Sequence, residues 1–251
     1  MQNRSTLKKL AKSGSTPAMY KLAESYGLYG SPASKREALR WYRAAAESGH
    51  ILSMYKLADE YELPFSSSER MREAYRWYRA AAEKGYLPAY YYVGDHLQEG
   101  RGVKKNVREA VQWFKRGAVA GDRDCMLSYG YHLFYGEGIR QDRVQAVSWY
   151  RKAARKHNPE AYFNLALCHY KGDVVAQNYR KAVELFKRAE RQMGKRAQGF
   201  LADFYEKGLG VRKSARWARY WREKAEGIRN YRGEFNTPEY LQWLKKVRKE
   251  G

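Results

Sequence analysis

The stretch Ala146-Val147-Ser148-Trp149-Tyr150-Arg151-Lys152-Ala153-Ala154 recurs along the chain in six related copies. Each leading alanine lies 36 residues after the one before it, at Ala38, Ala74, Ala110, Ala146, Ala182 and Ala218. Three residues further on, each copy has a large apolar residue: Trp41, Trp77, Trp113, Trp149, Leu185 and Trp221. A period of this length, held over six copies, is typical of a solenoid of stacked supersecondary units. The sequence therefore predicts a repeat array rather than a single globular core.

Each repeat contains two segments with helical patterning. The second segment places alanine, tryptophan, tyrosine and alanine at i, i+3, i+4 and i+7, which forms one apolar stripe. The first segment has the pattern small-x-aromatic-x-large-small at residues 18–23, 53–58, 89–94, 125–130, 161–166 and 197–202. Its small residues allow neighbouring helices to approach closely. We therefore predict helix-turn-helix repeats.

The turns and helix starts follow the same spacing. Paired glycines predict the turn after the first helix at Gly100/Gly102, Gly136/Gly138 and Gly208/Gly210. We predict N-caps for the second helices at Ser34, Asn106, Asp142, Asn178 and Ser214. Ser34 and Glu37 have the spacing of a capping box. The second repeat has Arg70 at the cap position and no paired glycines, so its loop is expected to be irregular.

The two ends of the chain depart from the repeat. Residues 2–13 are expected to form a lone helix that shields the first repeat, because terminal repeats of solenoids need caps. Near the other end, Thr237-Pro238-Glu239 has the order of an N-cap, a first-turn proline and a first-turn acid. The predicted organisation is a capping helix in 1–16, six repeats in 17–227, and a capping helix in 228–251. A docking helix for a partner is the alternative for the last segment.

Composition limits the class of protein. No run approaches the roughly 18 apolar residues that cross a bilayer, and the start of the chain lacks an apolar signal core. The two cysteines, Cys125 and Cys168, lie at different offsets in their repeats, so no disulfide framework is expected. We expect a cytoplasmic protein. The net charge of +22 indicates either an anionic partner or a solvated face that keeps the protein soluble.

The consensus Ala-x-x-x-Leu-Gly-x-x-Tyr-x-x-Gly-x-Gly-Val-x-x-Asp/Asn-x-x-x-Ala-x-x-Trp-Tyr-x-x-Ala-Ala resembles the Sel1-like repeat, a relative of the tetratricopeptide repeat. The resemblance covers roughly residues 17–227 and is strongest at 88–121 and 124–157. It implies an all-α, right-handed solenoid whose first helices line a concave groove. It also implies an adaptor or scaffold role, which in bacteria often concerns signalling or host interaction.

If that groove exists, its lining can be read from equivalent positions of the first helices. The expected partner-binding residues mix acids, histidines and aromatics: Lys21, Glu24, Lys56, Asp59, Glu60, Tyr92, Asp95, His96, Tyr131 and His132. Such a surface suits a peptide or partner helix with basic and apolar side chains. The alternative is that the solenoid itself shields several of them.

The second helices predict a different surface, a basic ladder that points away from the apolar stripe. Its members are Arg43, Arg79, Lys115, Arg116, Arg151, Lys152, Lys187 and Arg188. A nucleic acid or another polyanion could run along such a ladder through phosphate contacts. Base stacking is not expected there, because the tryptophans are predicted to point inward.

No catalytic site, metal site or cofactor is expected. His96, His132 and Cys168 occupy one column, but zinc ligands lie about 2 Å from the ion and successive repeats are spaced much further apart. The glycine-rich segments follow no strand and lack Gly-Lys-Ser/Thr, so we interpret them as turns and not as phosphate-binding loops.

Overall fold

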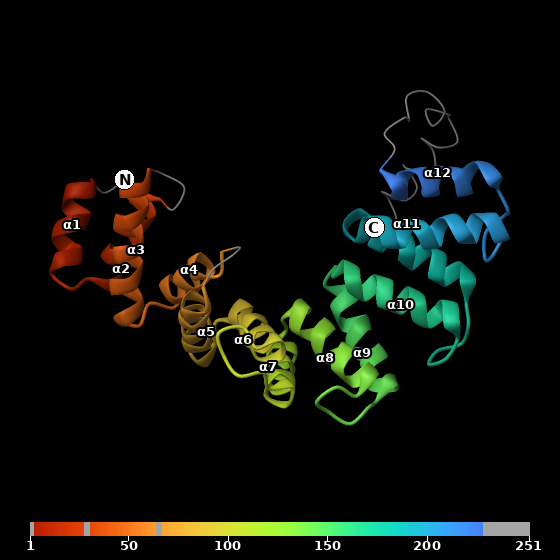
Figure 1. Ribbon diagram of the computed structural model, residues 1–251, viewed down its shortest axis with the longest axis horizontal. Helices are drawn as coiled ribbons and strands as arrows, with labels where there is room; N and C mark the ends of the chain where they lie inside the picture. The colour runs from red at the N-terminus through yellow and green to blue at the C-terminus, as the bar shows by residue number, and fades with distance from the viewer. Residues whose placement is uncertain (1–2, 28–30, 64–66, 228–251) are drawn as a thin grey trace. The chain divides into compact units, whose positions relative to one another are not determined.

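The computed structural model describes residues 3–27, 31–63 and 67–227 (Figure 1). Over these ranges every regular element is a helix. The twelve described helices are α1 (Arg4–Lys12), α2 (Thr16–Tyr26), α3 (Pro32–Glu47), α4 (Ile51–Tyr61), α5 (Ser68–Glu83), α6 (Leu87–Glu99), α7 (Val107–Ala120), α8 (Arg123–Tyr135), α9 (Arg143–Arg155), α10 (Pro159–Lys171), α11 (Tyr179–Lys207) and α12 (Ala215–Glu226). The chain divides into two compact units, Met1–Ala161 and Tyr162–Gly251.

From α2 onward the helices alternate between first and second helices of the repeat, so the predicted all-α array of six helix-turn-helix repeats is confirmed. The long helix α11 joins the second helix of the fifth repeat to the first helix of the sixth. Gly194 interrupts it with φ 43° and ψ −122°, outside the helical region. A glycine adopts such a conformation without steric penalty from a Cβ atom, which lets two helices meet end to end.

The core is built from the predicted stripe of the second helices. Ala38, Trp41, Tyr42 and Ala45 are all buried, and the equivalent large residues Tyr78, Phe114, Tyr150 and Phe186 are almost wholly inaccessible. The small residues of the first helices make room for these rings. A Cβ added to Gly94 would lie 2.5–2.8 Å from the Phe114 ring, and one on Gly130 would lie 2.8 Å from the Tyr150 ring. These helices therefore pack closer together than any residue with a Cβ atom at Gly94 or Gly130 would permit.

Four of the five predicted N-caps are confirmed, since the side chains of Asn106, Asp142, Asn178 and Ser214 accept hydrogen bonds from the backbone of their helices. The prediction of Ser34 was wrong. Helix α3 begins with Pro32, and its cap is Ser31, whose hydroxyl accepts from the Ser34 N–H. A proline in the first turn needs no N–H partner, so the helix extends by almost one turn.

The second repeat, for which no N-cap was predicted, also starts its second helix before the periodic position. Its cap is Ser67, which accepts from the Arg70 N–H, so Arg70 lies inside α5 and is not a cap. In both repeats the cap is a serine three residues before the position that fits the period.

The second glycine of each pair touches the preceding repeat. Gly102 has φ +66°, and a Cβ there would collide with the backbone of Met71 at the start of α5. At Gly138 the added Cβ would lie 2.9 Å from the Val107 side chain at the start of α7. The paired glycines therefore serve contact between repeats as well as the turn itself.

Helix α1 covers the first repeat. Its buried residues Leu7 and Ala11 join a cluster with Leu22, Ala38 and Tyr42. Asn3 caps this helix through its side chain. The predicted helix at 228–251 lies outside the described residues, and the domain boundaries at 16/17 and 227/228 stay predictions.

Candidate functional site

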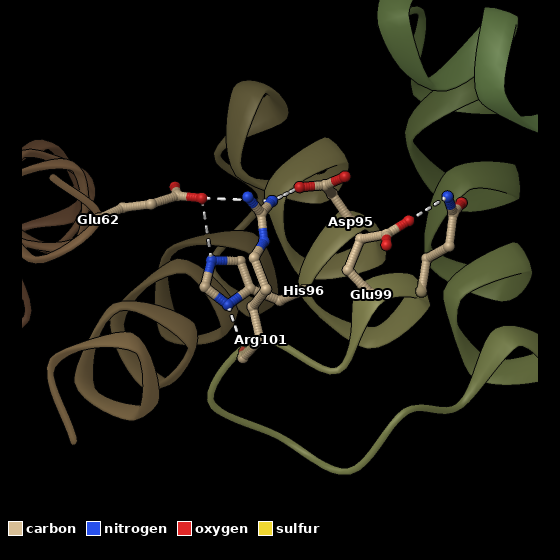
Figure 2. A network of polar contacts seen from close by, with 6 residues as sticks. Glu62, Asp95, His96, Glu99 and Arg101 are labelled. Atoms are coloured by element: carbon tan, nitrogen blue, oxygen red, sulfur yellow. Dashed lines mark hydrogen bonds and ion pairs between the residues drawn. The ribbon is translucent and has the colours of Figure 1, made fainter. Parts of the chain in front are cut away.

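A network of polar contacts connects the second and third repeats (Figure 2). Arg101, in the loop after α6, pairs with Asp95 of α6 and lies 3.3 Å from Oε1 of Glu62, which directly follows α4. The same Glu62 oxygen lies 3.4 Å from Nε2 of His96, which is within ion-pair range but outside hydrogen-bond geometry. One carboxylate therefore faces two cationic or potentially cationic groups of the next repeat.

His96 also holds its own loop. Its Nδ1–H donates to the Arg101 carbonyl at 2.7 Å. His132 repeats this contact 36 residues later, with Nδ1 2.9 Å from the Glu137 carbonyl and Nε2 2.9 Å from the side-chain oxygen of Gln98. In both repeats Nδ1 faces a carbonyl oxygen, which only accepts, so Nδ1 carries a proton and Nε2 faces the preceding repeat. At His132 the contact with the Gln98 oxygen is a hydrogen bond when Nε2 carries a proton as well, because an amide oxygen only accepts.

Burial and these partners together shift the pKa values of Glu62 and His132. Burial pushes the pKa of the Glu62 carboxyl up, but His96, Tyr78 and Arg101 together outweigh burial and hold that pKa below its usual range. Burial lowers the pKa of His132, against a smaller opposing effect of the Glu137 carbonyl. Its ring is stacked on Phe114 at 5.5 Å.

The predicted groove lining needs correction at three positions. Glu60, His96 and His132 are buried, the two histidines completely, so they do not line an accessible groove. Each lies three residues after a buried residue of its first helix. Positions i and i+3 share a helix face, so the packing that buries the first residue buries the second as well. Glu60 is occupied by an ion pair with Lys35 of α3.

The other predicted residues remain at the surface. Lys21, Glu24, Asp59 and Tyr131 are exposed, and Lys56, Tyr92 and Asp95 are half-buried. We call these seven residues the first-helix face. Two of its carboxylates already have partners, since Glu24 accepts a hydrogen bond from Tyr42 and Asp95 pairs with Arg101. Asp59 makes no ion pair within the described ranges, which makes it the acid of this face that is open to a partner.

A cluster of tyrosine rings lies near Asp59, whose charge acts on Tyr55 and Tyr78. Tyr55, one turn before Asp59, has its ring centroid 5.0 Å from Tyr86 and 5.8 Å from Tyr92. The Tyr92 ring is stacked on Tyr78 at 4.5 Å. Burial raises the pKa of the Asp59 carboxyl, and the neighbouring charge of Glu62 raises it further. This carboxylate is therefore partly desolvated, near like charge and flanked by aromatic faces.

Several members of these clusters were not predicted from the sequence, among them Glu62, Tyr55 and Arg101. Tyr55 is the aromatic residue of the first-helix motif, and its recurrence in the motif could have singled it out. Arg101 lies between the two glycines of a turn, where the sequence gives no sign that its side chain folds back to two carboxylates.

The basic ladder is largely at the surface. Arg43, Arg79, Lys115, Arg116, Arg151 and Arg188 are exposed, and Lys152 and Lys187 are half-buried. The structure adds an aromatic component, because cationic groups lie over the tryptophan rings. The distances to the ring centroid are 5.0 Å for Arg116 over Trp113 and 3.7 Å for Lys152 over Trp149. Trp41, Trp77, Trp113 and Trp221 are buried as predicted, whereas Trp149 is half-buried.

Within the residues that the structure describes, no three His, Cys, Asp or Glu side chains gather as metal ligands would. No described helix combines the length and the apolar character that a membrane span requires. Cys125 and Cys168 are both buried.

Comparison with known proteins gives a consistent result. The sequence profile of the Sel1 repeat matches six consecutive segments, residues 16–50, 51–86, 87–122, 123–158, 159–192 and 195–225. No curated protein sequence matches the chain.

Among solved structures, a protective antigen of uropathogenic Escherichia coli strains, described as displaying an SLR fold, is similar with 27% identity and a TM-score of 0.79. The match covers 100% of this chain and 57% of that chain, so the protein spans little more than half of the antigen's length. A Sel1 repeat protein from Oxalobacter formigenes is 26% identical with a TM-score of 0.72, over 90% of this chain and 99% of that one. An immunity protein from Pseudomonas aeruginosa, 17% identical with a TM-score of 0.51 over 85% and 81% of the two chains, shares the fold alone.

Proposed function

Because the chain belongs to the Sel1 repeat family, we propose that it is a non-enzymatic protein-interaction scaffold. Its first-helix face takes a peptide or partner helix that carries basic and apolar side chains. We also propose a cytoplasmic location, which the free, buried thiol of Cys125 supports.

The observation that carries the proposal is the environment of Asp59. The carboxyl has a raised pKa because it is partly buried and lies near Glu62, an effect that the charge of Lys56 offsets only in part, and it forms no ion pair within the described ranges. A partner's lysine or arginine would supply the missing charge. The tyrosine faces next to it favour the same cationic group and offer apolar contact area.

The proposal explains why aromatic and acidic residues alternate on the first helices. Tyr92 and Tyr131 supply rigid contact area at low cost in conformational entropy, and Tyr131 is 39% exposed. Lys21 and Lys56 on the same face would disfavour a uniformly basic partner, so we expect basic residues interspersed with apolar ones.

Selection from a random 16-residue peptide display library at 150 mM salt tests the proposal. We expect enriched peptides to combine Arg or Lys with aromatic or aliphatic residues. Asp59→Lys should reduce binding of a selected synthetic peptide at least tenfold, since a buried charge pair is replaced by repulsion.

The matched control is Glu47→Lys, which makes the same charge change at an exposed site of α3 on the second helices. It should leave binding within twofold of the unmodified protein. Enrichment of acidic peptides, or equal losses in the two variants, would overturn the proposal.

A further inference from the structure

Helices α7 and α9 differ from the other second helices in how their cations are neutralised. Each of the other second helices places some of its cations in ion pairs, namely Arg40 with Glu37, Arg76 with Glu73, Arg79 with Glu83, Arg188 with Glu184, and Lys224 with Glu190. Helix α9 contains no acidic residue, and the only acid of α7 is Glu109, which bonds to the N-cap Asn106.

Four cations of these two helices make up what we call the α7–α9 basic patch: Lys115, Arg116, Arg151 and Lys152. They are two pairs at equivalent positions of consecutive repeats. None makes an ion pair with a residue in the described ranges. Their charge is therefore available to an external anion, whereas the charge of Arg79 or Arg188 is already partly neutralised by a neighbouring carboxylate.

Tryptophan rings contact two of the four side chains of the patch. The Arg116 guanidinium lies over Trp113 and the Lys152 ammonium over Trp149, at the distances given above. A cation over an aromatic face keeps its charge while losing side-chain freedom, so less entropy remains to be lost on binding.

The two helices also adjoin at their carboxyl ends. Gly121 ends α7, Lys156 ends α9, and the Lys156 ammonium lies 3.9 Å from where a Cβ on Gly121 would stand. Arg155 and Lys156 are exposed as well and extend the positive surface beyond the two pairs. The ammonium that follows α9 therefore lies beside the end of α7.

We propose that the α7–α9 basic patch binds the phosphodiester backbone of a nucleic acid without reading its bases. A phosphate backbone carries closely spaced negative charges along one line, so one strand can neutralise both pairs at once. Base readout is not part of the proposal, because the indole rings lie beneath the cations and Trp113 is only 5% exposed.

A lipid surface fits the patch less well. Stable binding of a protein to a membrane surface needs apolar anchoring in addition to charge. In the two helices, Val119 and Val144 are the large apolar side chains that are mostly exposed, and two valines supply little apolar area. An acidic protein would also need its carboxylates placed to match, whereas a nucleic acid supplies phosphates at every nucleotide.

The test is fluorescence anisotropy of the full chain with a labelled 20-nucleotide oligouridylate at 50 and 200 mM NaCl. Four phosphate contacts to a single strand predict a loss of affinity of about 50-fold between the two salts. The variant Lys115→Gln/Arg116→Gln/Arg151→Gln/Lys152→Gln should lose at least tenfold in affinity at 50 mM salt, and most of the salt dependence. Glutamine keeps helix propensity, and far-UV circular dichroism checks that the variant folds.

The matched control is Arg40→Gln/Arg43→Gln/Arg76→Gln/Arg79→Gln, which removes the same number of charges from α3 and α5. It should change the affinity less than threefold. Equal losses in the two variants would refute the location of the site, and binding without salt dependence would refute the phosphate contacts. Poly-L-glutamate of equal charge that competes as well as RNA, or binding to phosphatidylserine vesicles without binding to RNA, would refute the choice of a nucleic acid.

Discussion

Gly94→Ala should destabilise the first compact unit, although alanine is the better helix former. Gly94 lies inside α6, where its missing Cβ leaves room for Phe114 of α7. An added Cβ would lie 2.5, 2.8 and 2.8 Å from three carbons of that ring. Cβ atoms rarely approach other atoms closer than 3.0 Å, and Phe114 is 1% exposed, so its ring has little space to move away.

The magnitude follows from two opposing effects. Alanine in place of glycine stabilises a helix interior by about 1 kcal/mol. Overpacking a tight core by one methyl costs about 1–3 kcal/mol. We expect overpacking to prevail, with a net loss of about 1 kcal/mol and a fall in Tm of about 3 °C for a unit of this size.

Gly199→Ala is the matched control. Gly199 is also inside a helix, α11, but nothing lies within 4 Å of its added Cβ. Helix propensity then acts alone, and this variant should gain about 0.5–1 kcal/mol. Urea unfolding followed at 222 nm measures both variants.

The double variant Gly94→Ala/Phe114→Leu provides a further check, because the smaller side chain relieves the overlap. The double variant should lose less free energy of unfolding than the two single variants lose in total. Stabilisation by Gly94→Ala comparable to that by Gly199→Ala would refute the close packing between α6 and α7.

Two further predictions concern the titratable groups. The pKa of Glu62 is lowered in the folded protein, so its contribution to stability is present above the usual carboxyl range and is lost as the pH falls through the lowered pKa. Thermal melts of the protein and of Glu62→Gln from pH 7 to 3 should show a stability difference that shrinks toward the acid end. A difference that stays constant with pH would contradict the network. Burial raises the pKa of the Cys125 thiol, so Ellman's reagent should react with it only after unfolding in urea, and rapid reaction of the native protein would contradict the buried site.

The repeat architecture could be predicted from the sequence because its determinants are local and recur six times. The stripe that includes Trp41 and Tyr42 appears in each copy, so an error in one repeat is corrected by the others. The N-caps show where this reasoning fails. Ser31 and Ser67 compete with the positions that fit the period, and only the starting point of each helix decides between them.

The candidate site was harder to predict because exposure depends on packing between repeats. His96 and Asp59 were both expected to line the groove, because they follow the buried residue of their first helices closely. Asp59 lies two residues after that buried residue, however, and His96 lies three residues after it. That offset turns one side chain into the core and the other toward solvent. The role of Arg101 depends on a loop conformation that glycine allows but does not dictate.

The two buried histidines have a consequence for cooperativity. Each clamps its own loop through one ring nitrogen and contacts the preceding repeat through the other, at Glu62 for His96 and at Gln98 for His132. A linear array behaves as a chain of units whose couplings to their neighbours need not be equal. The coupling between the second and third repeats then depends on an ionisable carboxylate, and that between the third and fourth on a neutral amide. Acid should therefore loosen the first junction before the second, so that the array separates into blocks at a defined place instead of fraying from its ends.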